Sequence, residues 1–158
     1  MITWKIRISN RCATVFIPPS NLRTMRFELL DHTADILVKA YGKSIEECFA
    51  NAALAMFDQM VDVSTIRLVG EVEVQIEGND KEDLLFDLLS ELLYIHDVDH
   101  VVLSSFDISF LEGGLRCLAK GEELDLKKHR PKTEVKAVTY HMLEVDEDTP
   151  SVTVLFDI

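Results

Sequence analysis

The sequence predicts an α+β domain in which two helices pack on one face of a largely antiparallel sheet. Three observations favour this class: two segments carry apolar residues at helical spacing, six or seven shorter segments have the pattern of strands, and short turn sequences join neighbouring strands. A length of 158 residues suits one domain. The apolar content of 47% is enough for a sizeable core, which excludes a wholly disordered chain.

The first half of the domain is predicted to contain two strands and a helix. Residues 26–30 form a short extended run, and residues 36–41 are a second strand that ends at Gly42. The segment that follows has capping-box form, with Ser44 as the N-cap and Glu47 three residues later. Apolar residues then recur at helical spacing: Ile45, Cys48, Phe49, Ala52, Met56, Phe57 and Met60. They predict an amphipathic helix of about four turns.

A change of period marks the next strand and the second helix. Val72, Val74 and Ile76 alternate with polar residues, so one face of this strand is expected to be buried. Gly78 breaks the strand, and Asn79 is predicted to cap the helix that follows. The core stripe of that helix consists of leucines: Leu84, Leu85, Leu88, Leu89 and Leu92.

Two hairpins are predicted to complete the sheet. Residues 101–111 and 115–120 are strands around Gly113 and Gly114, and residues 135–145 and 152–156 are strands joined across 146–150. A polar connection at residues 125–131 separates the two hairpins.

Charge divides the chain into a basic leader, residues 1–24, and an acidic domain, residues 25–158. The whole chain carries 16 basic and 28 acidic residues, a net charge of −12. The leader holds four of the basic residues and no acid, so the domain has a net charge of −16. We favour translation from an upstream start codon for this leader; a short strand or linker and a targeting peptide are the alternatives. We expect it to be irrelevant to activity.

The composition also limits location and partners. An acidic surface repels phosphate backbones, so direct binding to nucleic acid is not expected. No run approaches the roughly 18 consecutive apolar residues that a membrane-spanning helix needs. The three cysteines are widely spaced and form no CxxC pair. We therefore expect no disulfide framework and no zinc site, and a reducing compartment, the cytoplasm.

The candidate site is a set of carboxylates, because glycine-rich phosphate loops and the GxSxG and HExxH motifs are absent from the sequence. Asp35, Asp157 and the terminal carboxylate of Ile158 would supply hard oxygen ligands for Ca²⁺, Mg²⁺ or Mn²⁺. Asp31 would lie roughly 13 Å from Asp35 in an extended chain, so it joins them only if the chain turns. In the alternative interpretation Asp31 caps a turn, Asp35 begins a strand and Asp157 faces solvent.

Two further polar groups have structural and functional interpretations. On the penultimate strand, Lys136 and Tyr140 would share one face if the strand is regular, with Thr139 and His141 on the other. Like His32, His141 is more often a structural residue than a catalyst. The second helix carries Asp83, Asp87 and Glu91 at intervals of four, either a solvated face or a docking surface for a basic partner.

Four motifs, in order along the chain, resemble the archease family. They are DHTADI at residues 31–36, DLLSELL at 87–93, VKAVTYH at 135–141 and LFDI at 155–158. The resemblance runs from about residue 28 to the last residue. Members usually begin just before the first motif, so the leader departs from the family pattern.

The resemblance implies a fold built around a strand–helix–strand–strand unit and a divalent-metal site. Asp35 matches the aspartate near the family's N-terminus, while Asp157 and Ile158 match its final pair of residues. Ca²⁺ is the metal expected in isolation, with Mg²⁺ or Mn²⁺ as alternatives. An extension after Ile158 would displace a ligand.

The resemblance also implies a function that is not enzymatic. Archeases act with the RtcB-type RNA ligase in tRNA splicing and RNA repair, where they promote transfer of GMP onto the ligase histidine and repeated turnover. Two other classes stay open: a metal-dependent phosphoester hydrolase using Asp35, Asp157 and His141, and a general chaperone or assembly module for RNA-processing proteins.

Overall fold

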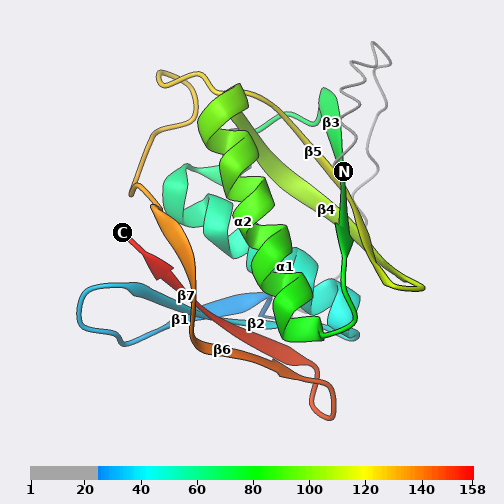
Figure 1. The fold of residues 1–158 in the computed structure, drawn as a ribbon. Coiled ribbons are helices and arrows are strands. Elements are labelled where there is room, and N and C mark those ends of the chain that lie inside the picture. Colours follow the sequence, from blue (N-terminus) through cyan, green and yellow to red (C-terminus); the bar gives the residue numbers. More distant parts are fainter. Residues whose placement is uncertain (1–24) are drawn as a thin grey trace.

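The computed structural model describes residues 25–158, which form two antiparallel sheets and two helices (Figure 1). The elements are, in chain order, β1 (Phe27–Leu30), β2 (Ile36–Tyr41), α1 (Ile45–Met60), the 3₁₀ turn η1 (Val63–Thr65), β3 (Gly70–Glu77), α2 (Lys81–Asp99), β4 (Val101–Leu111), β5 (Gly114–Glu123), β6 (Ala137–Asp146) and β7 (Ser151–Asp157). The predicted α+β class is confirmed. The predictions for the leader lie outside the described residues.

The strands divide between two sheets, where the sequence pattern predicted one. One sheet has the order β1-β2-β7-β6 and the other the order β3-β5-β4. Alternating residues identify strands but do not name their partners, so the pattern could not separate the sheets. The second sheet with α2 is the strand–helix–strand–strand unit β3–α2–β4–β5 that the family resemblance implied.

The two helices join the sheets into one core. α1 contacts β4 of one sheet and β2 and β7 of the other, and α2 contacts β3 and β6. Phe49, Phe57 and Phe156 are fully buried in the same apolar cluster. All five leucines of the predicted α2 stripe are buried as well. None of the described helices is long and apolar enough to cross a bilayer.

Helix starts and turns show which local predictions hold. Ser44 caps α1 by accepting a hydrogen bond from the backbone N–H of Glu47, as predicted. The cap of α2 is Asp80, which accepts from the N–H of Asp83, so the prediction of Asn79 is wrong by one residue. The β4–β5 hairpin turns as predicted, with Gly113 at φ 79°, a conformation that glycine adopts without strain.

The penultimate strand is not regular. The β6–β7 register shifts between Thr139 and Glu144, and Met142 has φ 60°. Lys136 lies one residue before the strand. The simple alternation predicted for residues 136–141 therefore does not extend through β6, because a bulge interrupts the period of two.

Candidate metal centre

Strand register places two of the predicted ligands at the same end of one sheet. The last pair of the β2–β7 ladder is Ile36 with Phe156. Asp35 comes one residue before Ile36, and Asp157 one residue after Phe156. Because β2 and β7 are antiparallel neighbours, both aspartates lie at this end of the ladder, although they are 122 positions apart in the chain. Ile158 follows at once and is 37% exposed.

The loop before Asp35 turns back on itself. Leu30 of β1 pairs with Leu37 of β2, so residues 31–36 reverse the chain direction. The separation estimated for an extended chain therefore does not apply to Asp31 and Asp35. Asp31 is exposed, whereas Asp35 is half-buried. The loop brings Asp31 back to the end of the sheet where Asp35 lies.

His32 in this loop has an unsatisfied nitrogen. Its Nδ1 atom is shielded from solvent and has no hydrogen-bond partner within the described part of the chain. Oδ2 of Asp35 lies 3.8 Å from this nitrogen, which is too far for a hydrogen bond. An unpaired buried nitrogen beside a carboxylate suits a position where a bound cation or water would complete the contacts.

On the side of β7 away from β2, the backbone around the start of β6 pairs with Asp157. The N–H of Lys136 donates to the carbonyl oxygen of Asp157 at 2.8 Å, and Ala137 is the register partner of Asp157. His141 lies within the part of β6 where the β6–β7 register shifts, between Thr139 and Glu144. The register therefore places Asp35 and Asp157 at the same end of the sheet and does not place His141 beside them.

The two aspartate side chains give three carboxylate ligands for a hard cation only together with the terminal carboxylate of Ile158. Across residues 25–158, no group of three or more His, Cys, Asp or Glu side chains is arranged to hold a metal ion. The site predicted from Asp35, Asp157 and Ile158 has two side-chain carboxylates and one backbone carboxylate. Three oxygen donors of this kind are ligands that Ca²⁺, Mg²⁺ and Mn²⁺ accept.

Comparisons with known proteins identify the family. Residues 27–158 match the model of the Archease protein family. The chain belongs to the archease family. The Protein archease of Pyrococcus abyssi is 44% identical over 126 residues, which is 77% of this chain and 89% of that protein. That of Methanothermobacter thermautotrophicus is 46% identical over 127 residues, covering 77% and 90%.

A solved structure agrees with the fold of this archease-family chain. The solution structure of protein 1598 from Methanobacterium thermoautotrophicum superposes with a TM-score of 0.68 at 38% sequence identity. The match covers 84% of this chain and 99% of that protein. The archease name is not that of an enzyme, and no enzyme family is indicated by these matches.

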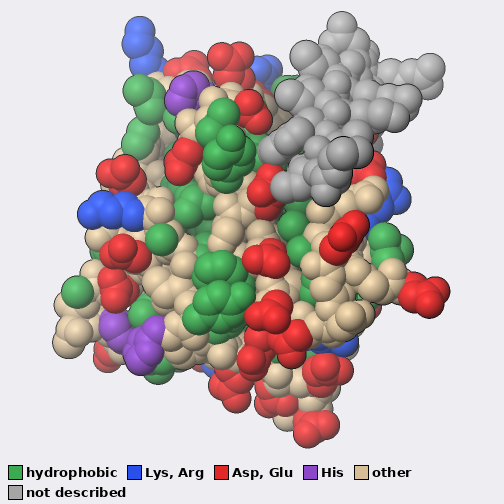
Figure 2. Space-filling view, in the orientation of Figure 1, with side chains coloured by type: hydrophobic (Ala, Val, Ile, Leu, Met, Phe, Trp, Pro, Cys, Tyr) green, Lys and Arg blue, Asp and Glu red, His purple; other side chains and the backbone are tan. Residues whose placement is uncertain are grey.

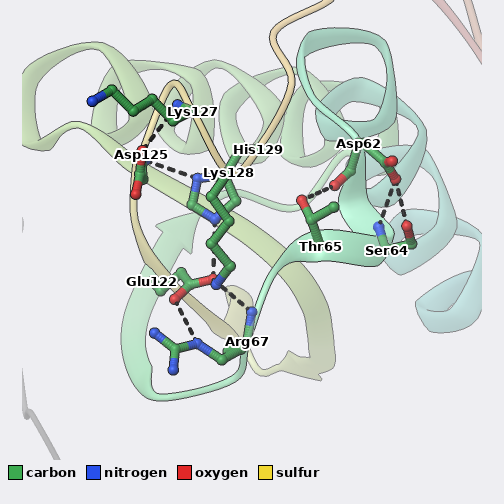
Figure 3. Close-up of polar contacts among 9 residues, drawn as sticks. All are labelled: Asp62, Ser64, Thr65, Arg67, Glu122, Asp125, Lys127, Lys128 and His129. Carbon is green, nitrogen blue, oxygen red and sulfur yellow. Dashed lines mark hydrogen bonds and ion pairs between the residues drawn. The ribbon is translucent and has the colours of Figure 1, made fainter.

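A second charged cluster in this archease-family protein was not predicted from the sequence (Figure 3). At the end of β5, Glu122 accepts hydrogen bonds from the backbone N–H of Arg67 at 2.8 Å and from the Nζ atom of Lys128. His129 is fully buried: Nε2 donates to Glu122 at 3.0 Å, and Nδ1 accepts from the N–H of Asp125 at 2.8 Å. This tautomer is assigned from the hydrogen-bond network.

The environment of Glu122 keeps it ionised. Burial alone would raise the pKa of its carboxyl, but the hydrogen bonds from Lys128, Arg67 and His129 outweigh burial and lower the pKa to about 2. Every polar atom of Glu122 and His129 has a partner, which is typical of a structural anchor. No spacing of residues in the sequence predicts this cluster, because Arg67 lies 55 residues before Glu122.

Proposed function

We propose that this protein activates an RtcB-type RNA ligase in tRNA splicing and RNA repair. In this role it promotes transfer of GMP onto the ligase histidine and supports repeated turnover. The observation that carries the proposal is the family match, which covers residues 27–158 and so includes both sheets and both helices. The proposed role needs the ligase, and not this protein, to hold the RNA, in keeping with a net charge of −16 on residues 25–158.

We further propose that Asp35, Asp157 and the backbone carboxylate of Ile158 hold a divalent cation, Ca²⁺ in isolation and Mg²⁺ or Mn²⁺ as alternatives. If this end of the sheet docks near the ligase histidine, a bound cation would supply positive charge close to the phosphate of GMP as it is transferred. The contribution of the protein is positional. Two observations support this proposal: the β2–β7 register puts both aspartates at the same end of the ladder, and the N–H of Lys136 donates to the carbonyl oxygen of Asp157 at the end of β7.

The proposed location is the cytoplasm, where an RNA ligase meets its substrates. Cys48 and Cys117, the two described cysteines, are free and buried. Burial raises the pKa of the Cys48 thiol to about 11 and that of Cys117 to about 12. Both thiols are therefore protonated and unreactive at neutral pH.

A turnover experiment tests the proposed function. A substoichiometric amount of the protein is mixed with its cognate ligase, GTP, Mn²⁺ and broken RNA, and ligated RNA is followed over time. We expect multiple-turnover ligation and a higher level of guanylylated ligase than without the protein. Ligation that stays at the level of the ligase alone would contradict the proposal. Nucleotide or phosphoester hydrolysis by the purified protein would instead favour the hydrolase.

A further inference from the structure

A groove of about 1000 Å³ runs along the exposed face of α2, between this helix, β3 and the tip of the β4–β5 hairpin. We call it the α2 groove. Its carboxylates come from three separate elements: Glu73, Glu77, Asp87, Glu91 and Glu112. No Lys or Arg lines the groove among the described residues, but Arg116 of β5 pairs with Glu73 at 3.1 Å. The other four carboxylates form no ion pair within the described part of the chain. The groove is therefore a concentrated region of negative charge on a protein that is acidic overall.

The carboxylates on the helix side are incompletely hydrated. Burial raises the pKa of Glu91, and its Oε1 atom is shielded from solvent without a hydrogen-bond partner in the described residues. Burial, followed by the charge of Asp83, raises the pKa of Asp87. α2 itself carries six carboxylates and a single Lys, so it does not neutralise its own charge. A cationic group in the groove would relieve this repulsion.

Large apolar side chains lie on both sides of the acidic row formed by Asp83, Asp87 and Glu91 on α2. On the groove side, Tyr94 is 55% exposed and Leu111 is 52% exposed. On the other side, Tyr140 of β6 stacks on Phe86 with ring centroids 3.9 Å apart, and its hydroxyl donates to Asp83 at 3.0 Å. Figure 2 shows acidic and apolar side chains intermixed over the front of α2. Exposed aromatic faces beside carboxylates suit Arg and Lys side chains, which pair with both.

We propose that the α2 groove binds a Lys- and Arg-rich segment of the RNA ligase that also carries an apolar side chain. The carboxylates of the groove attract the Lys and Arg side chains, and the apolar side chain packs against Tyr94 and Leu111. A protein that holds RNA needs exposed Lys and Arg side chains, so the ligase is a suitable source of such a segment. This inference rests on the proposed function, because it names the partner as the ligase.

Charge-neutral variants test the inference by affinity. The double variant Asp87→Asn/Glu91→Gln keeps side-chain size and removes two charges from the groove. The control, Glu123→Gln/Glu134→Gln, removes two charges from exposed residues that do not line the groove. We expect the groove variant to weaken ligase binding by about tenfold or more at low salt, and the control by less than about twofold. Binding of the wild type should weaken as salt is raised.

The outcomes separate this inference from the proposed function. If the wild type binds and activates the ligase but the groove variant binds equally well, or no worse than the control, the docking site is wrong and the function stands. If the wild type neither binds nor activates the ligase, both fail. Because each substitution removes an unfavourable charge, the groove variant should be no less stable than the wild type in thermal unfolding.

A photoreactive side chain identifies the occupant. A p-benzoylphenylalanine placed at position 90, between Asp87 and Tyr94 in the groove lining, is irradiated in the full-length protein mixed with the ligase. Mass spectrometry should find adducts on a Lys- and Arg-rich segment of the ligase. Adducts confined to residues 1–24 of the same chain, or absent from the ligase, would overturn the proposal, since the groove would then have another occupant or none.

Discussion

The two charged clusters of this protein, one around Glu122 and one around Asp35, differ in how completely their charges are paired. Glu122 is in contact with Arg67, Lys128 and His129, and its carboxylate is almost fully enclosed. Asp35 and Asp157 lie at one end of a sheet, and in the described residues no Lys or Arg forms an ion pair with either. The charge of Glu122 is paired by side chains of the same chain, whereas the carboxylates of Asp35 and Asp157 are available to a bound positive ion. This contrast separates a structural cluster from a candidate site.

Removal of either aspartate is expected to have the largest effect on function. Asp35→Ala or Asp157→Ala should reduce ligase activation to the level seen without the protein, because one of two side-chain carboxylates at the site is lost. The fold should remain, with a melting temperature within about 4 °C of the wild type, since neither side chain is fully buried. The measurements are multiple-turnover ligation and thermal unfolding.

The control for this pair is Asp148→Ala, an exposed carboxylate in the β6–β7 turn. It should leave activation unchanged. Full activation by both Asp35→Ala and Asp157→Ala would remove the metal from the mechanism, and the contrast with the Glu122 cluster would then have no functional meaning.

Glu122→Ala should have the largest effect on stability. It leaves the N–H of buried His129 without an acceptor and Lys128 without its carboxylate, and an unsatisfied buried donor of this kind costs about 1–3 kcal/mol. Chemical denaturation measures the loss, with Glu123→Ala as the exposed neighbour that should change stability by less than about 0.5 kcal/mol. An equal, small loss in both variants would show that the cluster is not a structural anchor.

The same cluster predicts a dependence of stability on pH. The pKa of Glu122 is about 2 in the folded protein against an ordinary value of 4.5, so the unfolded chain binds more protons between these values. The stabilisation from Glu122 is therefore fully present above pH 4.5 and is lost as pH falls toward 2. Denaturation at a series of pH values should show wild type and Glu122→Ala converging in stability at low pH. A constant difference between them would contradict this assignment.

Local features of the fold could be predicted from the sequence, and long-range pairings could not. The cap at Ser44, the leucine stripe of α2 and the hairpin at Gly113 each depend on residues a few positions apart. Tertiary contacts decide the division into two sheets and the bulge near Met142. The cap of α2 is a choice between two adjacent capping residues, and Asp80 takes this position in place of Asn79.

The candidate site was predicted only in part for the same reason. Residue type and family resemblance single out Asp35 and Asp157, and the β2–β7 register then puts these two residues, distant in sequence, at the same end of one ladder. The turn that returns Asp31 to this end of the sheet follows from the β1–β2 pairing. The Glu122 cluster brings together three segments with no motif, so single-sequence reasoning had no signal for it.

A smaller effect is expected at His32. Its Nδ1 atom lies 3.8 Å from Asp35 without a hydrogen-bond partner, in a position where a bound cation or its water would complete the contacts. His32→Ala should therefore weaken divalent-cation binding by about tenfold. Calorimetric titration with Ca²⁺ and with Mn²⁺ measures the change independently of ligation. His141→Ala, an exposed histidine elsewhere on the chain, is the control. Unchanged affinity in His32→Ala would make this histidine a bystander.

The smallest effect is expected from removal of residues 1–24. The family match begins at residue 27, and both charged clusters are formed by residues after it. Activation of the ligase by residues 25–158 should therefore equal that of the full chain in the turnover assay. The removal also takes away four basic side chains, which shifts the net charge from −12 to −16. If the α2 groove makes the contact, ligase binding should be equal or slightly tighter without the leader. A clear loss of binding or activation would show that residues 1–24 have a role of their own.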